Sequence, residues 1–255
     1  MKTYPVVEIT FSPTGGTKKV ADQISCYLGN ITNTVNLIRH DVSFSDVTVP
    51  SDSLAVIAAP VFEGVIPDIA IERLKEIQGN HANCVVIAVY GNRAYDDGLI
   101  QLKDTAELCG FNVIASVAEH SIMRQFGSGR PDEEDSKELK KFAEEILEKL
   151  SSDKELSTDY FVPGSHQYKR LGNLNVVPKA SASCTGCGKC ADACPTGAIN
   201  KNNIRTGDSS KCISCMGCIA ACPKGIRKLN PVFLAAASLK MKNLLSGRKP
   251  NEIFL

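Results

Sequence analysis

Eight of the eleven cysteines lie between residues 184 and 222, in two runs that share one spacing. Each run follows the pattern C-x-x-C-x-x-C-x-x-x-C-P, and the second repeats the first 28 positions later. Three thiolates two residues apart can surround one inorganic centre on a tight loop, while the fourth is carried away by a helical turn. The spacing therefore predicts two metal–sulfur centres, with one cysteine exchanged between the two runs.

This run is the one that bacterial ferredoxins use for [4Fe-4S] clusters. One cluster is predicted to take Cys184, Cys187, Cys190 and Cys222. The other is predicted to take Cys212, Cys215, Cys218 and Cys194. Structural zinc is the alternative, but it favours two C-x-x-C pairs and has no use for a third cysteine or for a fourth followed by proline. Disulfides are rare in a reducing compartment, the cytoplasm that we expect for a chain whose first residues do not resemble a secretory signal.

A second candidate site follows the first apolar segment of the chain. Its residues are Ser12, Pro13, Thr14, Gly15, Gly16 and Thr17. A loop between a strand and a helix can hold a phosphate, because amides at the helix start point toward the anion. A loop that binds a nucleoside triphosphate needs G-K-[ST], and a loop that binds a dinucleotide needs G-x-G-x-x-G. The segment has neither pattern. Hydroxyls and backbone amides therefore predict a phosphate cradle, with a simple capped turn as the alternative.

The elements that must position these residues alternate between strands and helices. Apolar strands are expected near residues 6–11, 33–38, 53–59, 84–90 and 112–118, with amphipathic helices between them and after the last. Such alternation predicts a parallel sheet covered on both faces. Five strands with a phosphate loop after the first predict an α/β, doubly wound sheet of order 2-1-3-4-5.

The domain boundaries are expected where composition changes. Residues 1–150 form the α/β domain, 151–180 a linker, 181–230 a small α+β domain with two [4Fe-4S] clusters, and 231–255 a helical tail. The tail is apolar and basic. It is expected to pack on the chain's own domains or on a second subunit, as in a homodimer, with a membrane surface as the alternative. No segment is long and apolar enough to predict a transmembrane helix.

Both the loop of residues 12–17 and the two cysteine runs resemble motifs of known protein families. The loop resembles the FMN phosphate loop of flavodoxins, S/T-x-T-G-x-T, and the chain resembles the flavodoxin–ferredoxin fusion proteins of anaerobic bacteria and archaea over most of residues 4–228. The resemblance implies a flavodoxin-like sheet domain that binds FMN, with Phe62 and Tyr95 as aromatic partners of its ring. The implied ring contacts come from two loops and are Pro60, Val61, Phe62, Gly91, Asn92, Arg93, Tyr95 and Asp96.

Charge is divided unevenly along the chain. Residues 1–150 hold 14 Lys and Arg against 22 Asp and Glu, a net of −8, and residues 151–255 hold 15 against 6, a net of +9. Two domains of different character fit this division. It does not indicate nucleic-acid binding, because anionic clusters would sit in the basic half.

Together these patterns predict an electron-transfer protein that relays electrons between FMN and two [4Fe-4S] clusters for a redox partner protein. Two alternatives stay open. One is a flavin-dependent reductase of a small substrate, although the sequence shows no catalytic acid, base or nucleophile set. The other is a ferredoxin module docked through a flavodoxin-like domain that does not bind flavin.

Overall fold

The computed structural model describes residues 3–120, 129–152, 156–172, 174–241 and 247–255. In this part the main sheet has the strand order β2-β1-β3-β4-β5-β8, with β1 to β5 parallel and β8 antiparallel. The strands are β1 (Tyr4–Thr10), β2 (Gly29–Asn36), β3 (Leu54–Pro60), β4 (Asn83–Tyr90), β5 (Asn112–His120) and β8 (Glu252–Phe254). The order of the five parallel strands confirms the predicted doubly wound arrangement.

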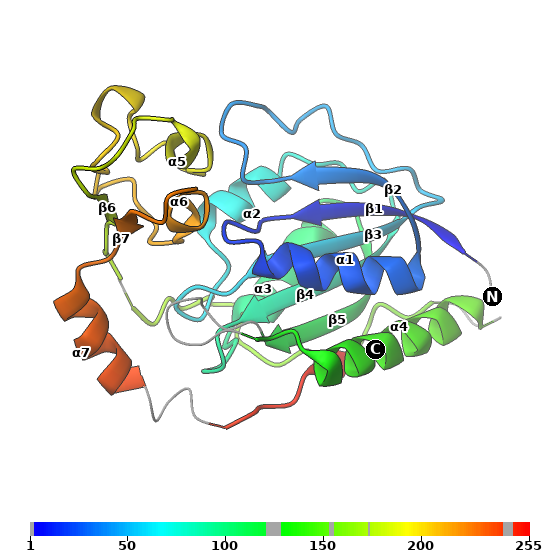
Figure 1. Cartoon of the computed structure of the whole chain (residues 1–255). Helices are drawn as coiled ribbons and strands as arrows, with labels where there is room; N and C mark the ends of the chain where they lie inside the picture. The colour runs from blue at the N-terminus through cyan, green and yellow to red at the C-terminus, as the bar shows by residue number, and fades with distance from the viewer. Residues whose placement is uncertain (1–2, 121–128, 153–155, 173, 242–246) are drawn as a thin grey trace.

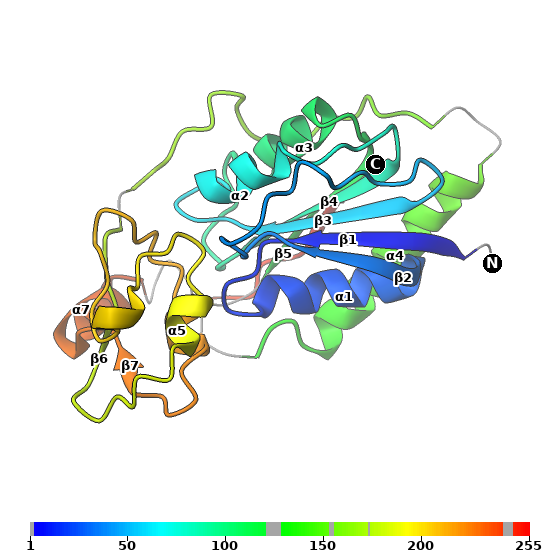
Figure 2. The same cartoon turned by 90° about the horizontal axis from the view of Figure 1, so that it is seen from above.

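Two helices cover each face of the sheet (Figure 2). On one face lie α1 (Gly16–Leu28) and α4 (Glu133–Ser151), and on the other lie α2 (Asp68–Leu74) and α3 (Gly98–Leu108). Each face has its own apolar core. Both faces of β3 and β4 are buried, which is why these strands are near-continuous runs of apolar residues.

The cysteine module is a small unit with the symmetry that its sequence repeat predicts. Its two short helices, α5 (Lys189–Asp192) and α6 (Gly217–Ala220), are 28 residues apart, and a single-turn helix, η1 (Lys201–Asn203), lies between them. Its strands β6 (Lys179–Ala180) and β7 (Arg227–Lys228) pair antiparallel. This pairing connects the segment before the cysteine runs, at Lys179, to the segment after them. It lies beyond the carboxyl ends of the parallel strands, where α/β sheets hold ligands (Figure 1).

The segments on either side of the module return to the α/β domain. Before it, the carboxylate of Asp97 accepts hydrogen bonds from the backbone N–H groups of Ser165 and Lys169, at 2.8 and 2.9 Å. After it, α7 (Pro231–Met241) extends from the module, and the chain comes back to pair β8 with β5. The expected helical tail is thus only partly right. A three-residue strand with so short an apolar pattern is not distinguishable from a loop in sequence.

Candidate functional site

Two cavities in the module are each lined by four cysteines. One is lined by Cys184, Cys187, Cys190 and Cys222. The other is lined by Cys194, Cys212, Cys215 and Cys218. Each cavity thus combines three cysteines of one run with the fourth of the other run, which is the crossed arrangement expected from the spacing.

The thiols surround the cavities and do not converge on one point. Among the described residues, no group of three or more His, Cys, Asp or Glu side chains is spaced to hold a single metal ion. Burial raises the pKa of the Cys215 thiol to about 12 and that of Cys218 to about 11. Burial also acts to raise the pKa of Cys222, but backbone N–H groups at residues 224–227 outweigh it and lower that pKa. Such cavities fit a cluster whose positive iron atoms hold the sulfurs as thiolates.

We call the second cavity the inner cavity, because its residues contact the α/β domain. A Cβ atom at Gly217 would lie 3.0 Å from the carbonyl oxygen of Pro13, so α6 and the loop after β1 are in close contact. Ile213 lines the inner cavity and packs on the core of the α/β domain. The first cavity is the outer cavity, and its Cys187 is exposed.

A second contact between the cysteine module and the α/β domain is made by Arg73 of α2. Its side chain is 8 % exposed, and its guanidinium donates to the carbonyl of Pro195 at 2.6 Å and to that of Leu37 at 2.6 Å. Pro195 directly follows Cys194 of the inner cavity. Sequence reasoning missed Arg73, because nothing in the pattern of α2 distinguishes a buried arginine from a solvated one.

The loop after β1 has the geometry of an anion cradle. Gly15 has the left-handed φ of 89° with open space beside it, and the Ser12 hydroxyl accepts from the backbone N–H of Lys18 at 2.9 Å. The first N–H groups of α1 have no carbonyl one turn earlier to bond, so those of Gly16 and Thr17 are available for an anion. The Lys18 side chain turns away to Glu8, at 2.8 Å, so the cradle consists of amides and hydroxyls.

The loop after β3, the strand that pairs with β1, makes a tight turn. Phe62 and Val65 exchange backbone hydrogen bonds of 2.8 and 3.2 Å, with Glu63 and Gly64 at φ of 54° and 90° between them. The Glu63 carboxylate accepts from the backbone N–H of Leu174 in the linker. Glu63 therefore holds the linker, a role that the sequence pattern did not suggest, while Pro60 is buried and Val61 and Phe62 are half-buried.

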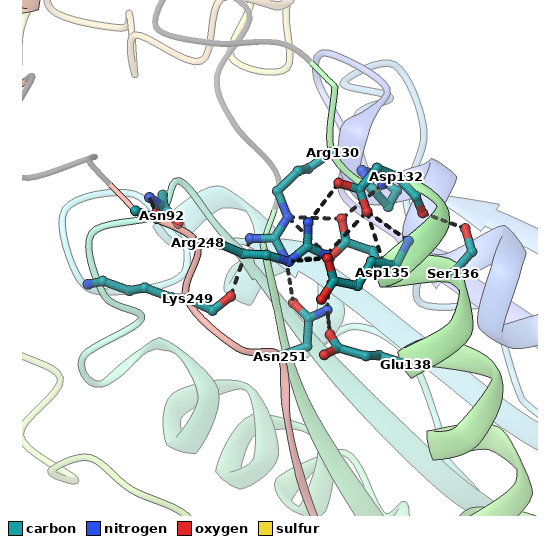
Figure 3. Close-up of polar contacts among 12 residues, drawn as sticks. Asn92, Arg130, Asp132, Asp135, Ser136, Glu138, Arg248, Lys249 and Asn251 are labelled. Carbon is teal, nitrogen blue, oxygen red and sulfur yellow. Dashed lines mark hydrogen bonds and ion pairs between the residues drawn. The ribbon is translucent and has the colours of Figure 1, made fainter.

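The loop after β4 is held by the C-terminal segment (Figure 3). The Asn92 side chain donates to the carbonyl of Gly247 at 2.8 Å, and Lys249 donates to the carbonyl of Arg93. The same segment is fixed to the start of α4, where Arg248 bonds Asp132 and Asp135 at 2.7 Å each. Gly91 has open space beside it, and Asp96 pairs with Arg93.

The Tyr95 side chain, in the loop after β4, contacts the core of the α/β domain. Its ring meets that of Tyr90 edge-on, with centroids 5.3 Å apart, and packs on the core of the α/β domain. Its hydroxyl bonds the Glu252 carboxylate of β8, and burial with this bond raises the pKa of Tyr95. Both expected aromatic partners of a flavin ring, Phe62 and Tyr95, are half-buried.

The comparisons with known proteins agree with this division of the chain. Residues 177–223 match the family model of the 4Fe-4S dicluster domain. No curated protein matches the chain.

Solved structures resemble the α/β domain at low similarity. Flavodoxin 1 from Bacillus cereus is 17% identical, with 58% of this chain and 99% of that one covered and a TM-score of 0.42. The FMN-bound flavodoxin of Fusobacterium nucleatum is 14% identical, with 57% and 98% covered and a TM-score of 0.39. The rubredoxin:oxygen oxidoreductase of Desulfovibrio gigas is 15% identical, with 59% and 38% covered and a TM-score of 0.41.

The strand order of the chain itself supports the flavodoxin-like assignment, and the cysteine runs support the cluster assignment. Among the described residues, no helix combines the length and apolar composition that a membrane crossing needs. The chain thus joins an α/β domain with the strand order 2-1-3-4-5 to a segment, residues 177–223, that matches the 4Fe-4S dicluster domain.

Proposed function

We propose that this chain is an electron-transfer protein that holds FMN in its α/β domain and two [4Fe-4S] clusters in its cysteine module. One observation carries the proposal. The residues around the inner cavity contact the loop after β1, so the two expected cofactor sites adjoin. The flavin would supply exchange of one or two electrons, and each cluster exchange of one.

The chain's residues divide the binding tasks. The eight cysteines hold the clusters, four to each cavity. The amides of Gly16 and Thr17, with the hydroxyls of Thr14 and Thr17, hold the FMN phosphate. Phe62 and Val61 of the loop after β3, and Gly91 of the loop after β4, would contact the ring. Tyr95 of the loop after β4 is the second aromatic partner proposed for the ring.

Two attachments keep the cofactor sites at a fixed separation. The linker is held by Glu63 and Asp97, and the C-terminal segment by Asp132 and Asp135. The module is therefore tied to the α/β domain before and after its cysteine runs. A fixed separation favours electron exchange within the chain over exchange by chance encounter of two free domains.

The experiment is purification under argon, with iron, acid-labile sulfide and flavin quantified per chain. Eight irons, eight sulfides and one FMN are expected. Four irons, or zinc in place of iron, would contradict the cluster assignment. Eight irons without FMN, even after incubation with added FMN, would leave a ferredoxin module docked on a domain that binds no flavin.

A further inference from the structure

Arg227, at the start of β7, is the largest of the fully buried side chains in the described part of the chain. It is 1 % exposed and lines both the inner and the outer cavity. A buried guanidinium is unfavourable unless other groups compensate its charge. The position of Arg227 between two cysteine-lined cavities therefore needs an explanation.

The sequence repeat shows how unusual this residue is. The position equivalent to Arg227 in the first run, 28 residues earlier, is Ile199. Ile199 is 7 % exposed and belongs to the module's small apolar core. One half of the module thus fills this position with an aliphatic side chain and the other half with a cation.

The hydrogen bonds of Arg227 leave one donor unused. One terminal nitrogen donates to the carbonyl of Pro178 at 2.7 Å, and the other donates to the carbonyl of Ile204. The Nε–H is buried and meets no acceptor among the described residues. Buried donors without an acceptor are rare in native proteins, so a donor of this kind beside two cofactor cavities indicates an acceptor on the cofactor.

We propose that the Nε–H of Arg227 donates a hydrogen bond to a sulfur atom of one of the two adjacent [4Fe-4S] clusters, and that its charge holds this cluster at a higher reduction potential than the other one. The inference rests on the proposed cluster content. Arg227 lines the inner cavity together with Cys212 and Cys218, and the outer cavity together with Cys222.

The effect on the potential follows from charge. Reduction makes a cluster more negative, so a nearby cation and a hydrogen bond to sulfur both favour the reduced form. The two cysteine runs have the same spacing, so their clusters are expected to have similar reduction potentials. A residue that differs between the runs, such as Arg227, can make these two potentials differ. The cluster that accepts this hydrogen bond would hold an added electron in preference to the other cluster.

The test is a redox titration of the full-length, cluster-loaded protein, followed by electron paramagnetic resonance. Arg227→Ile installs the residue that the first run carries, and Arg227→Lys keeps the charge without the Nε–H. The matched control is Lys228→Gln, which removes an exposed charge from the next residue. We expect one of the two potentials to fall in Arg227→Ile, to fall less in Arg227→Lys, and to change least in the control.

Unchanged potentials in an Arg227→Ile protein with eight irons would overturn the inference, as would an equal shift in Lys228→Gln. Fewer than eight irons in the wild type would instead contradict the proposed function. A measurement on the wild type covers the case in which the variants lose their clusters. Arginine labelled with ¹⁵N at Nε should give a nitrogen coupling in pulsed resonance spectra of the reduced protein, and absence of that coupling would overturn the inference.

Discussion

The guanidinium of Arg73 donates to the carbonyl oxygen of Pro195, and this bond of 2.6 Å joins α2 to the residue that follows Cys194. The same guanidinium bonds Leu37 and Ile38 at 2.6 and 3.0 Å, so one buried side chain connects two parts of the α/β domain to a cluster ligand segment. Burial lowers the pKa of Arg73, while the charges of Glu72 and Glu76 act in the opposite direction.

Replacing Arg73 should loosen the module. In Arg73→Leu three backbone carbonyls lose their donor, and a buried hydrogen bond to a charged group contributes about 1.5 to 3 kcal/mol. We expect the free energy of unfolding to fall by about 2 kcal/mol or more, and residues around Pro195 to become sensitive to protease. Arg39→Leu is the control, because the Arg39 side chain is exposed and bonds only Asp41 among the described residues. Equal effects of the two substitutions would show that Arg73 does not fasten the module.

Single cysteine variants test the crossed ligation. Because Cys194 lines the inner cavity with Cys212, Cys215 and Cys218, Cys194→Ser should damage that cluster and spare the one held by its sequence neighbours. Cys190→Ser, four residues earlier, should damage the outer cluster. The measurement is iron content together with the resonance signals of each reduced cluster. Loss of the same signal in both variants would show that each run binds its own cluster.

Sequence predicted the parts of this protein whose patterns have a physical period or a fixed spacing. The five parallel strands follow from alternating apolar segments, and the cavities group the cysteines as the repeat predicts. Contacts between distant segments have no such local signal. The pairing of β8 with β5 and the anchoring of the linker by Glu63 could be seen only in the folded chain.

The importance of Arg227 could be predicted in part from the sequence. When the two cysteine runs are aligned, Arg227 is equivalent to Ile199, so the sequence alone shows a cation at a position that is aliphatic in the other run. Its burial and its unused donor needed the structure. The contacts of Tyr95 with Tyr90 and Glu252 likewise needed the structure.

Flavin binding should depend on the hydroxyls of the loop after β1. Thr14→Ala combined with Thr17→Ala removes both hydroxyls while leaving the backbone amides, so we expect FMN affinity to fall by about tenfold or more, the loss of one to two hydrogen bonds to a charged group. Cluster content should be unchanged. The measurement is fluorescence titration with FMN and riboflavin, and Thr34→Ala on exposed β2 is the control. Equal affinity of the wild type for riboflavin and FMN would contradict a phosphate site.

Glu119 should make stability depend on pH. Its side chain is fully buried, neither oxygen has a hydrogen-bond partner among the described residues, and burial raises its pKa to about 9, with Asp135 adding to the effect and Arg130 opposing it. Between the unfolded pKa of 4.5 and the folded value, the unfolded state binds fewer protons. The Glu119 contribution to stability therefore falls as pH rises through this window.

Glu119→Gln removes this contribution. Urea unfolding at pH 5 and pH 8.5 should show that the variant loses less stability than the wild type over this range, by about 1 kcal/mol or more, since one pKa unit corresponds to about 1.4 kcal/mol. Exposed Glu148→Gln is the control and should behave like the wild type. A wild-type pH dependence that Glu119→Gln retains in full would show that Glu119 is ionised in the folded protein.

Direct oxidation of NADH or NADPH should not occur. The loop after β1 lacks the G-x-G-x-x-G pattern of a dinucleotide site. A loop for a nucleoside triphosphate has lysine directly after its last glycine, whereas here Gly16 is followed by Thr17 and then Lys18. In stopped-flow experiments under argon, NADH alone should bleach neither flavin nor clusters, whereas a low-potential dye should reduce them. Rapid bleaching by NADH, in protein free of contaminating reductase, would favour a flavin-dependent reductase over a carrier.

Charge around the outer cavity should govern exchange with other molecules. Exposed Lys179, Lys189, Lys224 and Lys228 surround this cavity or lie next to residues that line it. An anionic dye should therefore exchange electrons faster at low salt and slow as the Debye length falls from about 10 Å at 0.1 M to about 3 Å at 1 M, while a neutral dye should not. Lys189→Glu with Lys224→Glu should remove the salt effect, and Lys140→Glu with Lys141→Glu on α4 should preserve it. A salt effect that survives the first pair would place the site of exchange elsewhere on the molecule.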